Sequence, residues 1–562
     1  SAHKHVAGSA LYVDDVAEPS NLLHAYFGVS EQAHARILKM DLSEVKQYPG
    51  VVRTLTAADI PGDNEISPMH KFDEPVLADG LVQFAGQPLF IVVAESRTIA
   101  RRAATLARVE YEELPAILDI ETALKEKSYV LEPHSMKRGD PCTAIANAPE
   151  RLQGSVYTGS QDHFYLEGQV SMALPKEDGD MLVLTSSQHP TEVQHLVARS
   201  LGKPMSAVTV EVRRIGGAFG GKETQAAQWA IMATVAADAT GRPVKLRLDR
   251  DDDMRSTGKR HDFLIRYDVG FDDEGRVLGI EFTHALRCGI SSDLSGPIAD
   301  RAMFHSDNAY YLPDVSITSY RCKTNTETNT AFRGFGGPQG MVGIERVIDA
   351  IARHLGKDPL DVRKANFYGV DTRNTTPYKM TVKDNILPGL VAELEASSRY
   401  RERRRQIADF NRDSPVIRKG IALTPAKFGI SFTTTFLNQA AALVHVYKDG
   451  SVHLNHGGTE MGQGLHTKVS QVVALELGID VGRVRATAND TSKVANTSAT
   501  AASTGSDLNG KAAQHAARQI RDRLAQLVGE QQGVDAAEVE FVADQVRWPG
   551  GSMAFDELVV QA

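Results

Sequence analysis

The sequence predicts a mixed α/β (α+β) protein built from several domains. With 562 residues, it is long enough for roughly three or four domains of ordinary size. Strand-like alternation at 208–212 leads through a glycine-rich turn into an alanine-rich helical pattern that stops at Gly241. A buried strand at 88–95 is likewise followed by a helical pattern at 98–109. Strands and helices that alternate in this way indicate packed sheets and helices.

Composition excludes several function classes. The net charge of −9 does not favour nucleic acid or an anionic membrane as a partner. There is no run of about 18 apolar residues, as a membrane span would need, and the first residues have no apolar signal core. The three cysteines form no CxxC pair, so the chain cannot hold an iron–sulfur cluster or a zinc ribbon. Their odd number and wide spacing indicate buried thiols and a cytoplasmic location.

The first two segments predicted along the chain are a small domain and a linker. Residues 1–115 alternate short strands with turn signals and carry no catalytic pattern, so packing and subunit contact are the roles we expect. Residues 116–153 are predicted to be a linker with short helices, because Pro133, Pro141 and Pro149 interrupt the pattern.

A larger mixed domain is predicted at 154–395. It holds the glycine-rich turn, a strand at 243–248 and a helix at 343–355 that Gly356 ends. A linker helix follows at 396–417, with a cluster of arginines at 399, 401, 403, 404 and 405. Such a run can bind nucleic acid, but in an acidic chain we interpret it as a solvated helix face.

The last predicted domain covers 418–562. Alternation at 441–447 with Asp449 and Gly450 predicts a hairpin, and a helix is expected near 467–477. Ser552 is a candidate N-cap for a C-terminal helix. Because no terminating glycine follows this helix, we expect the chain to be a piece of a longer polypeptide whose last domain is incomplete.

The turn at 213–224, Arg-Arg-Ile-Gly-Gly-Ala-Phe-Gly-Gly-Lys-Glu-Thr, is the central motif. A glycine-rich turn between a strand and a helix offers backbone N–H groups and a helix dipole to an anion. Residues 216–222 fit the G-x-x-x-x-G-K phosphate loop, but Glu223 stands where that loop needs Ser or Thr. A tight turn used only for packing is the other alternative.

Two further glycine-rich turns favour a ligand-binding role for the first one. They read Thr-Ala-Phe-Arg-Gly-Phe-Gly-Gly-Pro at 330–338 and His-Gly-Gly-Thr-Glu-Met-Gly-Gln-Gly at 456–464. Three such turns in one chain suggest that a single large ligand is held by backbone groups from several sides.

At this point the sequence resembles the molybdenum-cofactor subunit of the xanthine dehydrogenase family. The resemblance covers nearly the whole chain, and it rests on GGAFGGKE at 216–223, TAFRGFGGPQ at 330–339, KFGISFT at 427–433, HGGTEMGQGLHTK at 456–468, TAAS at 500–503, QDHFYLE at 161–167 and the stretch around Arg301 and Phe304. It implies an N-terminal α/β hammerhead domain and two elongated molybdopterin-binding domains, with the site at their interface.

The resemblance also implies a cofactor and its binding residues. Molybdenum bound to a pterin dithiolene would carry oxo, sulfido and hydroxyl ligands, with no direct protein ligand. The amides of Phe219 and Gly220 and the side chain of Gln188 would lie by the oxygen ligands, near the metal but not bound to it. The residues implied to hold the pterin and its phosphate are Arg333, Gln463, Ala502 and Ser503. Arg333 would also lie near the metal without binding it. From the residues alone, Gln188 would be an ordinary polar residue after a strand.

Five residues are implied to bind the substrate. Phe335 and Phe432 would sandwich a flat heteroaromatic ring, and Thr433 would add a hydroxyl in its plane. Glu223 and Arg301 would be the catalytic pair, because a carboxylate accepts from ring N–H groups and a guanidinium stabilises negative charge on a carbonyl oxygen. The alternatives are two core phenylalanines and a structural salt bridge between Glu223 and Arg301.

The expected function is hydroxylation of hypoxanthine and xanthine to urate, with water as the oxygen source. The family's general-base glutamate lies in a Gly-Glu-Pro-Pro motif that does not occur in 1–562, and Glu460 lies in a different motif. We therefore expect a C-terminal continuation, partner domains or subunits with two [2Fe–2S] clusters and FAD, NAD or O2 as acceptor, and a higher-order oligomer.

Other readings remain open. An aldehyde or other N-heterocycle hydroxylase of the same family is the nearest one, and a scaffold or binding subunit is the non-enzyme one. A carbon monoxide dehydrogenase is disfavoured, because its active loop carries a cysteine where this chain has Gly334, Phe335 and Gly336.

Overall fold

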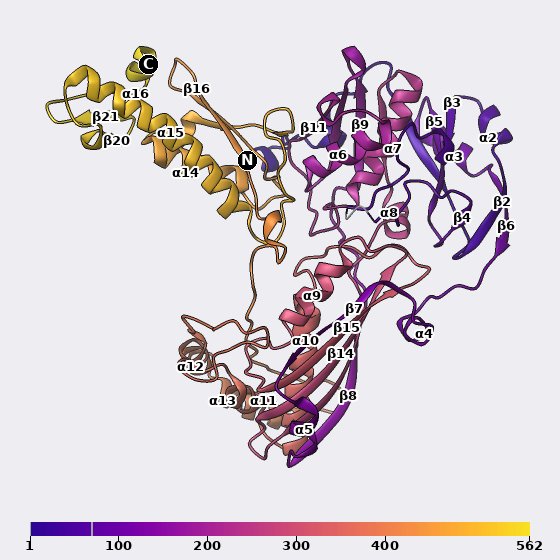
Figure 1. The fold of residues 1–562 in the computed structure, drawn as a ribbon, viewed down its shortest axis with the longest axis vertical. Coiled ribbons are helices and arrows are strands. Elements are labelled where there is room, and N and C mark those ends of the chain that lie inside the picture. The colour runs from indigo at the N-terminus through magenta and orange to yellow at the C-terminus, as the bar shows by residue number, and fades with distance from the viewer. Residues whose placement is uncertain (1, 69–70) are drawn as a thin grey trace.

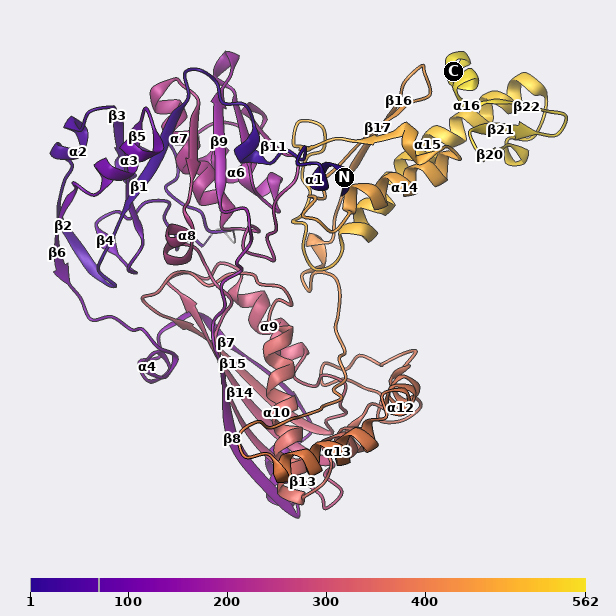
Figure 2. The same ribbon diagram turned by 180° about the vertical axis from the view of Figure 1, so that it is seen from behind.

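The structure, a computed structural model, describes residues 2–68 and 71–562 and has three lobes (Figure 1). The first lobe is built on an eight-stranded sheet, the second on a five-stranded sheet, and the third on a three-stranded sheet with two long helices. The mixed α/β class is therefore confirmed. Helix α1 (Ala2–Val6) lies between the first and third lobes, as the view from behind also shows (Figure 2).

Strands from three distant parts of the chain form the sheet of the first lobe. Their order is β19 (Asn489–Asp490), β11 (Val208–Val212), β10 (Met181–Thr185), β9 (Val170–Pro175), β12 (Val244–Arg247), β1 (Leu23–Val29), β5 (Pro88–Ala94) and β3 (Val51–Thr56). The parallel pairing of β1 with β12 fuses the N-terminal segment to the following domain. The antiparallel pairing of β19 with β11 brings in a piece of the third lobe.

Helices cover both faces of this sheet. Alternate residues of β1 and β5 point to opposite faces, so Leu23 and Ile91 pack with α6 (Pro190–Leu201) and α7 (Ala226–Thr240), whereas Phe90 packs with α3 (Arg97–Ala104). Helix α7 is buried nearly all round, which its alanine-rich, uncharged sequence allows. Smaller elements at this side of the molecule are β2 (Ala35–Asp41), β4 (Leu81–Val82), β6 (Arg108–Glu113), α2 (Ser43–Gln47), α4 (Ile120–Lys125) and α8 (Arg250–Ser256).

The second lobe wraps a sheet around a helix. Its strand order is β7 (Tyr129–Arg138), β15 (Asp314–Lys323), β14 (Val277–Gly289), β13 (Phe263–Phe271) and β8 (Glu150–Thr158). Ile344, Val347, Ile348 and Ile351 lie on one face of α10 (Gly337–Leu355) and are buried against this sheet. The other helices of the lobe are α5 (Pro141–Ala146), α9 (Ser295–Phe304), α11 (Pro359–Asn366), α12 (Leu387–Ser397) and α13 (Tyr400–Asp413).

In the third lobe, two helices pack together on a small sheet. Helices α14 (Leu465–Leu477) and α15 (Gly505–Gln532) share a core with β16 (Ala442–Val446), β17 (Val452–His456) and β18 (Val484–Ala486). The predicted hairpin at 441–456 and the helix near 467–477 are thus present. The lobe ends with β20 (Glu540–Val542), β21 (Gln545–Trp548), β22 (Gly551–Ala554) and α16 (Phe555–Gln561).

Several sequence predictions about single elements are wrong. The helix expected at 98–109 ends at Ala104, because residues 108–113 pair with β2 as strand β6. The expected linker at 116–153 does contain α4 and α5, but it also contains β7. This strand lies at the edge of its sheet, where Pro133 is tolerated because its missing N–H breaks no ladder bond.

Two predictions about single residues also fail. Ser552 is not an N-cap, because it lies in β22; α16 begins at Phe555, and the Ala554 N–H donates to Glu557 instead. Cys142 is exposed and not buried, whereas Cys288 and Cys322 are buried as predicted.

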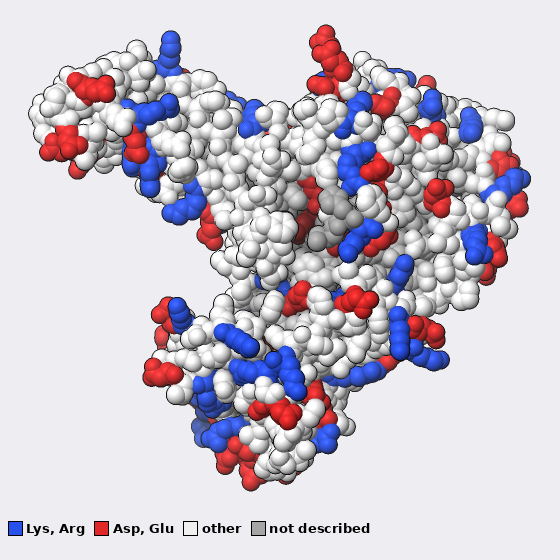
Figure 3. All heavy atoms as spheres, in the orientation of Figure 1, with Lys and Arg blue, Asp and Glu red and all other residues white. Residues whose placement is uncertain are grey.

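The arginine-rich segment forms a solvated helix, as predicted. Of the residues in α13, only Tyr400 is buried. Arg401 and Arg404 pair with carboxylates of the second lobe, among them Asp358. Basic and acidic side chains are mixed over this part of the surface (Figure 3). Within the described ranges, 2–68 and 71–562, no helix has the length and apolarity needed to cross a bilayer.

Two glycines at the ends of α10 allow a direct test of how this helix docks. Both Gly336 and Gly356 have a positive φ, but a Cβ at 336 would lie 2.1 Å from the Ile298 carbonyl oxygen of α9, whereas one at 356 would meet nothing within 4 Å. Gly356→Ala should therefore destabilise the second lobe by about 1–2 kcal/mol, the cost of a left-handed alanine. Gly336→Ala should destabilise it several times more. Thermal unfolding of the two variants checks this, and equal losses would contradict the close approach of α9 and α10.

Candidate functional site

The three glycine-rich turns meet at the junction of the lobes. The Arg333 N–H of the turn at 330–338 donates to the Phe219 carbonyl of the turn at 213–224 over 2.8 Å. The Ile215 N–H of the latter turn donates to the Glu460 carbonyl of the turn at 456–464 over 2.9 Å. Backbone hydrogen bonds thus fix the three turns to one another, in the arrangement that one shared ligand would require.

Gln188 joins the first lobe to the loop before α15. Its Oε1 accepts from the Gly220 N–H, and its Nε2 donates to the Thr500 carbonyl, both over 3.0 Å. Its main chain bonds to the Lys222 carbonyl and to the Thr500 N–H, each over 2.9 Å. The side chain is buried, so its orientation, and that of the Gly220 amide, is fixed.

Several predicted cofactor and substrate residues have a strained backbone. Phe219, Phe335, Ala502 and Ser503 all have φ between 52° and 58°, a region that residues with a side chain rarely adopt. Such strain costs about 1–3 kcal/mol per residue and is found mainly at functional sites. At Gly220, φ is 104° and a Cβ would lie 2.5 Å from the Ala331 carbonyl oxygen, so only glycine fits there.

The same loops leave backbone donors free. Among the described residues, the N–H groups of Phe219, Ala502 and Ser503 have no protein acceptor. Ala502 and Ser503 lead directly into α15, a helix of 28 residues whose N-terminal end is positively polarised. This loop and helix end together can bind a phosphate group.

The turn at 456–464 is held by side-chain hydrogen bonds within itself. The Glu460 carboxylate accepts from the N–H groups of Gly462, Gly464 and His466 and so caps α14. Burial acts to raise its pKa, but these donors outweigh burial, and the pKa is lowered. Glu460 is therefore an ionised cap and not a base. The Gln463 side chain, predicted to hold the pterin, is bonded within its own turn to Met461 and Thr459.

Arg301 lies on α9 and holds the 427–433 segment. Its guanidinium donates to the carbonyls of Gly429, over 2.6 Å, and Ser431, over 2.5 Å, and Nε is buried without a partner. The Ser431 N–H in turn donates to the Ala502 carbonyl over 2.9 Å. Phe428, which the sequence did not single out, lies 5.7 Å from the Arg301 guanidinium carbon. Arg301 thereby connects the second lobe to the loop before α15.

The two rings predicted to sandwich the substrate lie on different segments of the chain. Phe335 packs against the core of the second lobe, and Phe432 and Thr433 lie on the 427–433 segment, with Thr433 exposed. Among the residues with described positions, Phe335 and Phe432 have no ring contact with each other. Arg333 is exposed, and its guanidinium has no partner within the described ranges.

Glu223 is a buried carboxyl at the end of the central turn. Burial raises its pKa to about 8; His189 acts to lower the pKa, whereas Glu192 and Asp293 raise it further. In the part of the chain that the structure describes, its side chain has no hydrogen bond and no ion pair, with Arg301 or any other residue. The structural salt bridge weighed above is thus absent, and at neutral pH Glu223 can donate an O–H.

A cavity of about 1240 Å³ opens beside the turns at 213–224 and 456–464. Its wall includes Gly217, Phe219, Met461 and Gly462 from these turns, and His5 from α1. The cavity is large enough for a sizeable organic cofactor.

Family comparisons agree with this geometry. The description "Aldehyde oxidase and xanthine dehydrogenase, a/b hammerhead domain" matches residues 7–115, and "Molybdopterin cofactor-binding domain" matches 123–367 and again 393–562. The chain belongs to the xanthine dehydrogenase and aldehyde oxidase family. Its cofactor is molybdopterin.

Similar proteins share this assignment. The chain is 43% identical to xanthine dehydrogenase/oxidase of Gallus gallus over 525 residues, which are 93% of this chain and 38% of that protein. It is 45% identical to xanthine dehydrogenase 1 of Arabidopsis thaliana over 530 residues, 93% of this chain and 39% of that one. The chain thus spans well under half the length of these family members.

Solved structures show the same fold. Quinoline 2-oxidoreductase from Pseudomonas putida 86 has a TM-score of 0.90 at 25% identity, with 100% of this chain and 74% of that chain covered. The reconstituted CO dehydrogenase of Oligotropha carboxidovorans has a TM-score of 0.86 at 23% identity, with coverage of 100% and 75%.

The residues present fit a molybdopterin. Free N–H groups at Ala502 and Ser503 suit its phosphate, the exposed Arg333 can add a positive charge, and the Phe219 amide is free to face an oxygen ligand of the metal. The Gly220 N–H, expected to lie by an oxygen ligand as well, donates to Gln188 Oε1 in this structure.

Replacing Gln188 by alanine should release the cofactor. The change leaves the Gly220 N–H and the Thr500 carbonyl without their partner, so we expect a several-fold lower molybdenum content per folded protein. Gln194→Ala is the matched control, because Gln194 is also buried and its side chain also makes two bonds to the backbone, as a donor to the carbonyls of Met205 and Val208. Metal analysis of the two purified variants decides: equal molybdenum contents would contradict the special role of Gln188.

Proposed function

We propose that this chain is the molybdenum-cofactor part of a xanthine dehydrogenase that hydroxylates hypoxanthine and xanthine to urate with oxygen from water. The observation that carries the proposal is the buried Glu223 carboxyl, which is free of protein partners within the described residues and lies at the end of the turn whose free Phe219 amide would face the cofactor. The sequence identity of 42–45% between this chain and xanthine dehydrogenases supports the same conclusion.

The chain's own residues bind and orient the purine. Molybdopterin, once bound, supplies the oxidation, because no side chain can accept two electrons as a hydride. Glu223, as a neutral acid, can donate to a purine nitrogen or oxygen and accept from a ring N–H at the same time. A site that pairs both kinds of group discriminates strongly against ligands that lack them.

Arg301 is proposed to stabilise negative charge that builds on the substrate oxygen. Its buried, unpartnered Nε and its position beside the 427–433 segment support this role. Burial lowers the pKa of Arg301, and a buried cation acts more strongly on a nearby anion than one in water does. Phe335, Phe432 and Thr433 would close around the purine when it binds.

The electrons are proposed to pass to partner domains or subunits with [2Fe–2S] clusters and FAD, and from there to NAD or O2. The general base is proposed to lie on a C-terminal continuation, in keeping with the limited part of the relatives that this chain spans. A cytoplasmic location and a higher-order oligomer complete the proposal.

A second candidate is an N-heterocycle or aldehyde hydroxylase of the same family. Two observations favour it. The chain is similar to quinoline 2-oxidoreductase over its whole length. In addition, two N–H groups of the Arg301 guanidinium donate to backbone carbonyls and are therefore not free to bind a substrate oxygen. Steady-state assay of the complete complex with xanthine, quinoline and an aromatic aldehyde separates the two. A strong preference for quinoline or aldehyde would overturn the first proposal.

Glu223→Ala should lower kcat/KM for xanthine by about 10²–10³, as the loss of one transition-state donor does, while molybdenum content stays normal. The wild type should lose xanthine activity as the pH rises above about 8, because the acid form of Glu223 ionises there. The variant should lack this step. Parallel loss of activity and molybdenum would mean that Glu223 supports the fold instead.

Arg301→Met should shift the ratio of kcat/KM from xanthine towards an aromatic aldehyde. The reason is that an aldehyde presents no second carbonyl for the guanidinium to bind. Competition assays with both substrates measure the ratio, and an unchanged ratio would contradict the assigned role.

A further inference from the structure

Lys222, the lysine of the central turn, is buried and not available to a ligand. Its side chain has no exposed surface, and its ammonium donates to the Glu167 carbonyl oxygen over 2.7 Å and to Glu167 Oε2 over 3.2 Å. The ammonium also lies 4.6 Å from the centre of the Tyr165 ring, a cation–π contact. In a phosphate loop the corresponding lysine would reach the ligand, so Lys222 has a different task in this turn.

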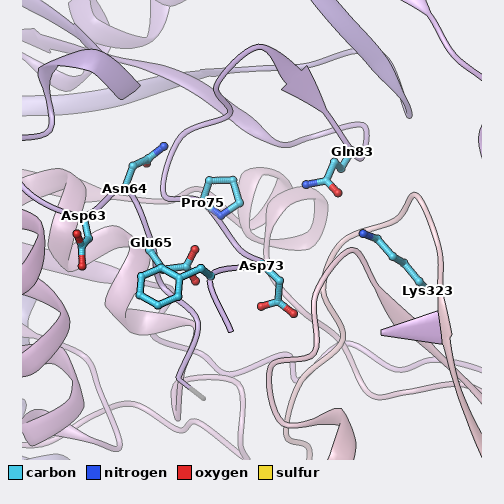
Figure 4. A pocket seen from close by; sticks show the side chains of 8 residues that line it. Asp63, Asn64, Glu65, Asp73, Pro75, Gln83 and Lys323 are labelled. Carbon is cyan, nitrogen blue, oxygen red and sulfur yellow. The ribbon is translucent and has the colours of Figure 1, made fainter. Parts of the chain in front are cut away.

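Lys323 shows the contrast with a lysine that is open to solvent. It lines a cavity of about 590 Å³ to which none of the three glycine-rich turns contributes. Glu65 and Asp73 lie on one side of this cavity, and Lys323 approaches from the other (Figure 4). In the described part of the chain Lys323 has no ion pair, whereas the protein itself occupies the ammonium of Lys222.

Glu167 joins the two ends of the glycine-rich turn. Its Oε2 accepts from the Gly216 N–H over 2.8 Å as well as from Lys222, and its own N–H donates to the Gly216 carbonyl over 3.2 Å. The approach is close, because a Cβ at Gly216 would lie 2.6 Å from the Glu167 Cβ. Gly216 and Lys222 flank Phe219, so the ion pair closes the loop that carries the free Phe219 amide.

The segment that carries Glu167 supports a second turn as well. Residues 161–169 form no helix or strand. His163 Nε2 donates to the Ala331 carbonyl of the turn at 330–338 over 2.7 Å, and a Cβ at Gly221 would lie 2.6 Å from the His163 ring. Gln169 Nε2 donates to the Gly221 carbonyl over 3.0 Å. One irregular segment thus contacts the backbone of two of the three turns.

The burial of this ion pair needs an explanation other than stability. The side chains of Lys222 and Glu167 are 0% and 11% exposed. Burial lowers the pKa of Lys222, and the charge of Glu167 opposes this shift. An apolar pair of similar size is often at least as stabilising as a buried ion pair, but it cannot hold a backbone N–H and a backbone carbonyl in fixed positions. The Lys222–Glu167 pair holds both.

We propose that Lys222 and Glu167 are positioning residues for the cofactor, and that their ion pair fixes the central turn so that the Phe219 amide faces the cofactor cavity. The wall of that cavity includes Phe219 and Glu167. The φ of 56° at Phe219 is strained, and such a conformation persists only where the surroundings enforce it. The inference rests on the proposed position of this amide beside the cofactor and does not depend on the substrate.

The test is the double variant Glu167→Gln/Lys222→Met in the assembled, molybdenum-containing complex. Glutamine and methionine keep the approximate size of both side chains and leave no unpaired buried charge, so thermal unfolding should stay close to that of the wild type. The turn, however, loses the bonds that close it. Hydrogen exchange of the peptide 216–223 should become about tenfold faster, and the EPR signal of the reduced molybdenum should change in its g values.

The matched control is Glu18→Gln/Lys245→Met. Lys245 is also a buried lysine of the first lobe, with a side chain that is 6% exposed and an ammonium 2.8 Å from Glu18 Oε1, but it belongs to β12 and not to the turn. This variant should leave both the exchange of the peptide 216–223 and the EPR signal as they are in the wild type.

Glu167→Asp is a second variant, which decides the question if the double variant does not fold. Aspartate keeps a negative charge beside Lys222 but is one methylene shorter, so it cannot reach Gly216 and Lys222 together. It should speed exchange and change the EPR signal. Wild-type exchange and signal in a folded variant would overturn the inference, as would a loosened turn with an unchanged signal. No measurement here uses a substrate, so a wild type that fails to oxidise xanthine would refute only the proposed function.

Discussion

The hydrogen bonds of one amide side chain hold the site together. Gln188 contacts the Gly220 N–H of the first lobe and the Thr500 carbonyl of the loop that enters α15. Both bonds are buried, where a lost partner costs about 1–3 kcal/mol. The pairing of β19 with β11 joins the same two parts of the molecule, so Gln188 is one of several links that hold the loop before α15 against the central turn.

Backbone geometry, more than side-chain chemistry, shapes the pocket. Phe219 and Phe335 hold left-handed conformations next to glycines that a Cβ would displace, and Ala502 and Ser503 do so in succession. A main chain held in this way leaves N–H groups free to bind a ligand, whereas a regular strand would use them in the hydrogen bonds of a β-sheet. The energy stored there is balanced by the large cores of the adjacent sheets, which are rigid enough to impose it.

Much of this could be predicted from the sequence. The glycine-rich motifs predicted that the three turns meet, because glycine has no side chain to keep backbones apart. A long alanine-rich pattern predicted helix α7. What could not be predicted depends on partners far away in sequence. Strand β7 exists because β15 pairs with it, and Arg301 bonds carbonyls that lie about 130 residues further on.

A motif tells which residue types stand in a turn, but not which hydrogen bonds their side chains make. The bonds of the Gln463 amide to Met461 and Thr459 are of this kind.

The two-residue strand β19 covers an edge of the eight-stranded sheet. It covers β11, which would otherwise be the outermost strand of the eight-stranded sheet, with Val212 opposite Asn489. A fragment lacking the third lobe would expose a row of unpaired backbone donors and acceptors at that margin, the kind of template on which chains stack into aggregates. The third lobe thus protects the solubility of the first as well as contributing a wall to the pocket.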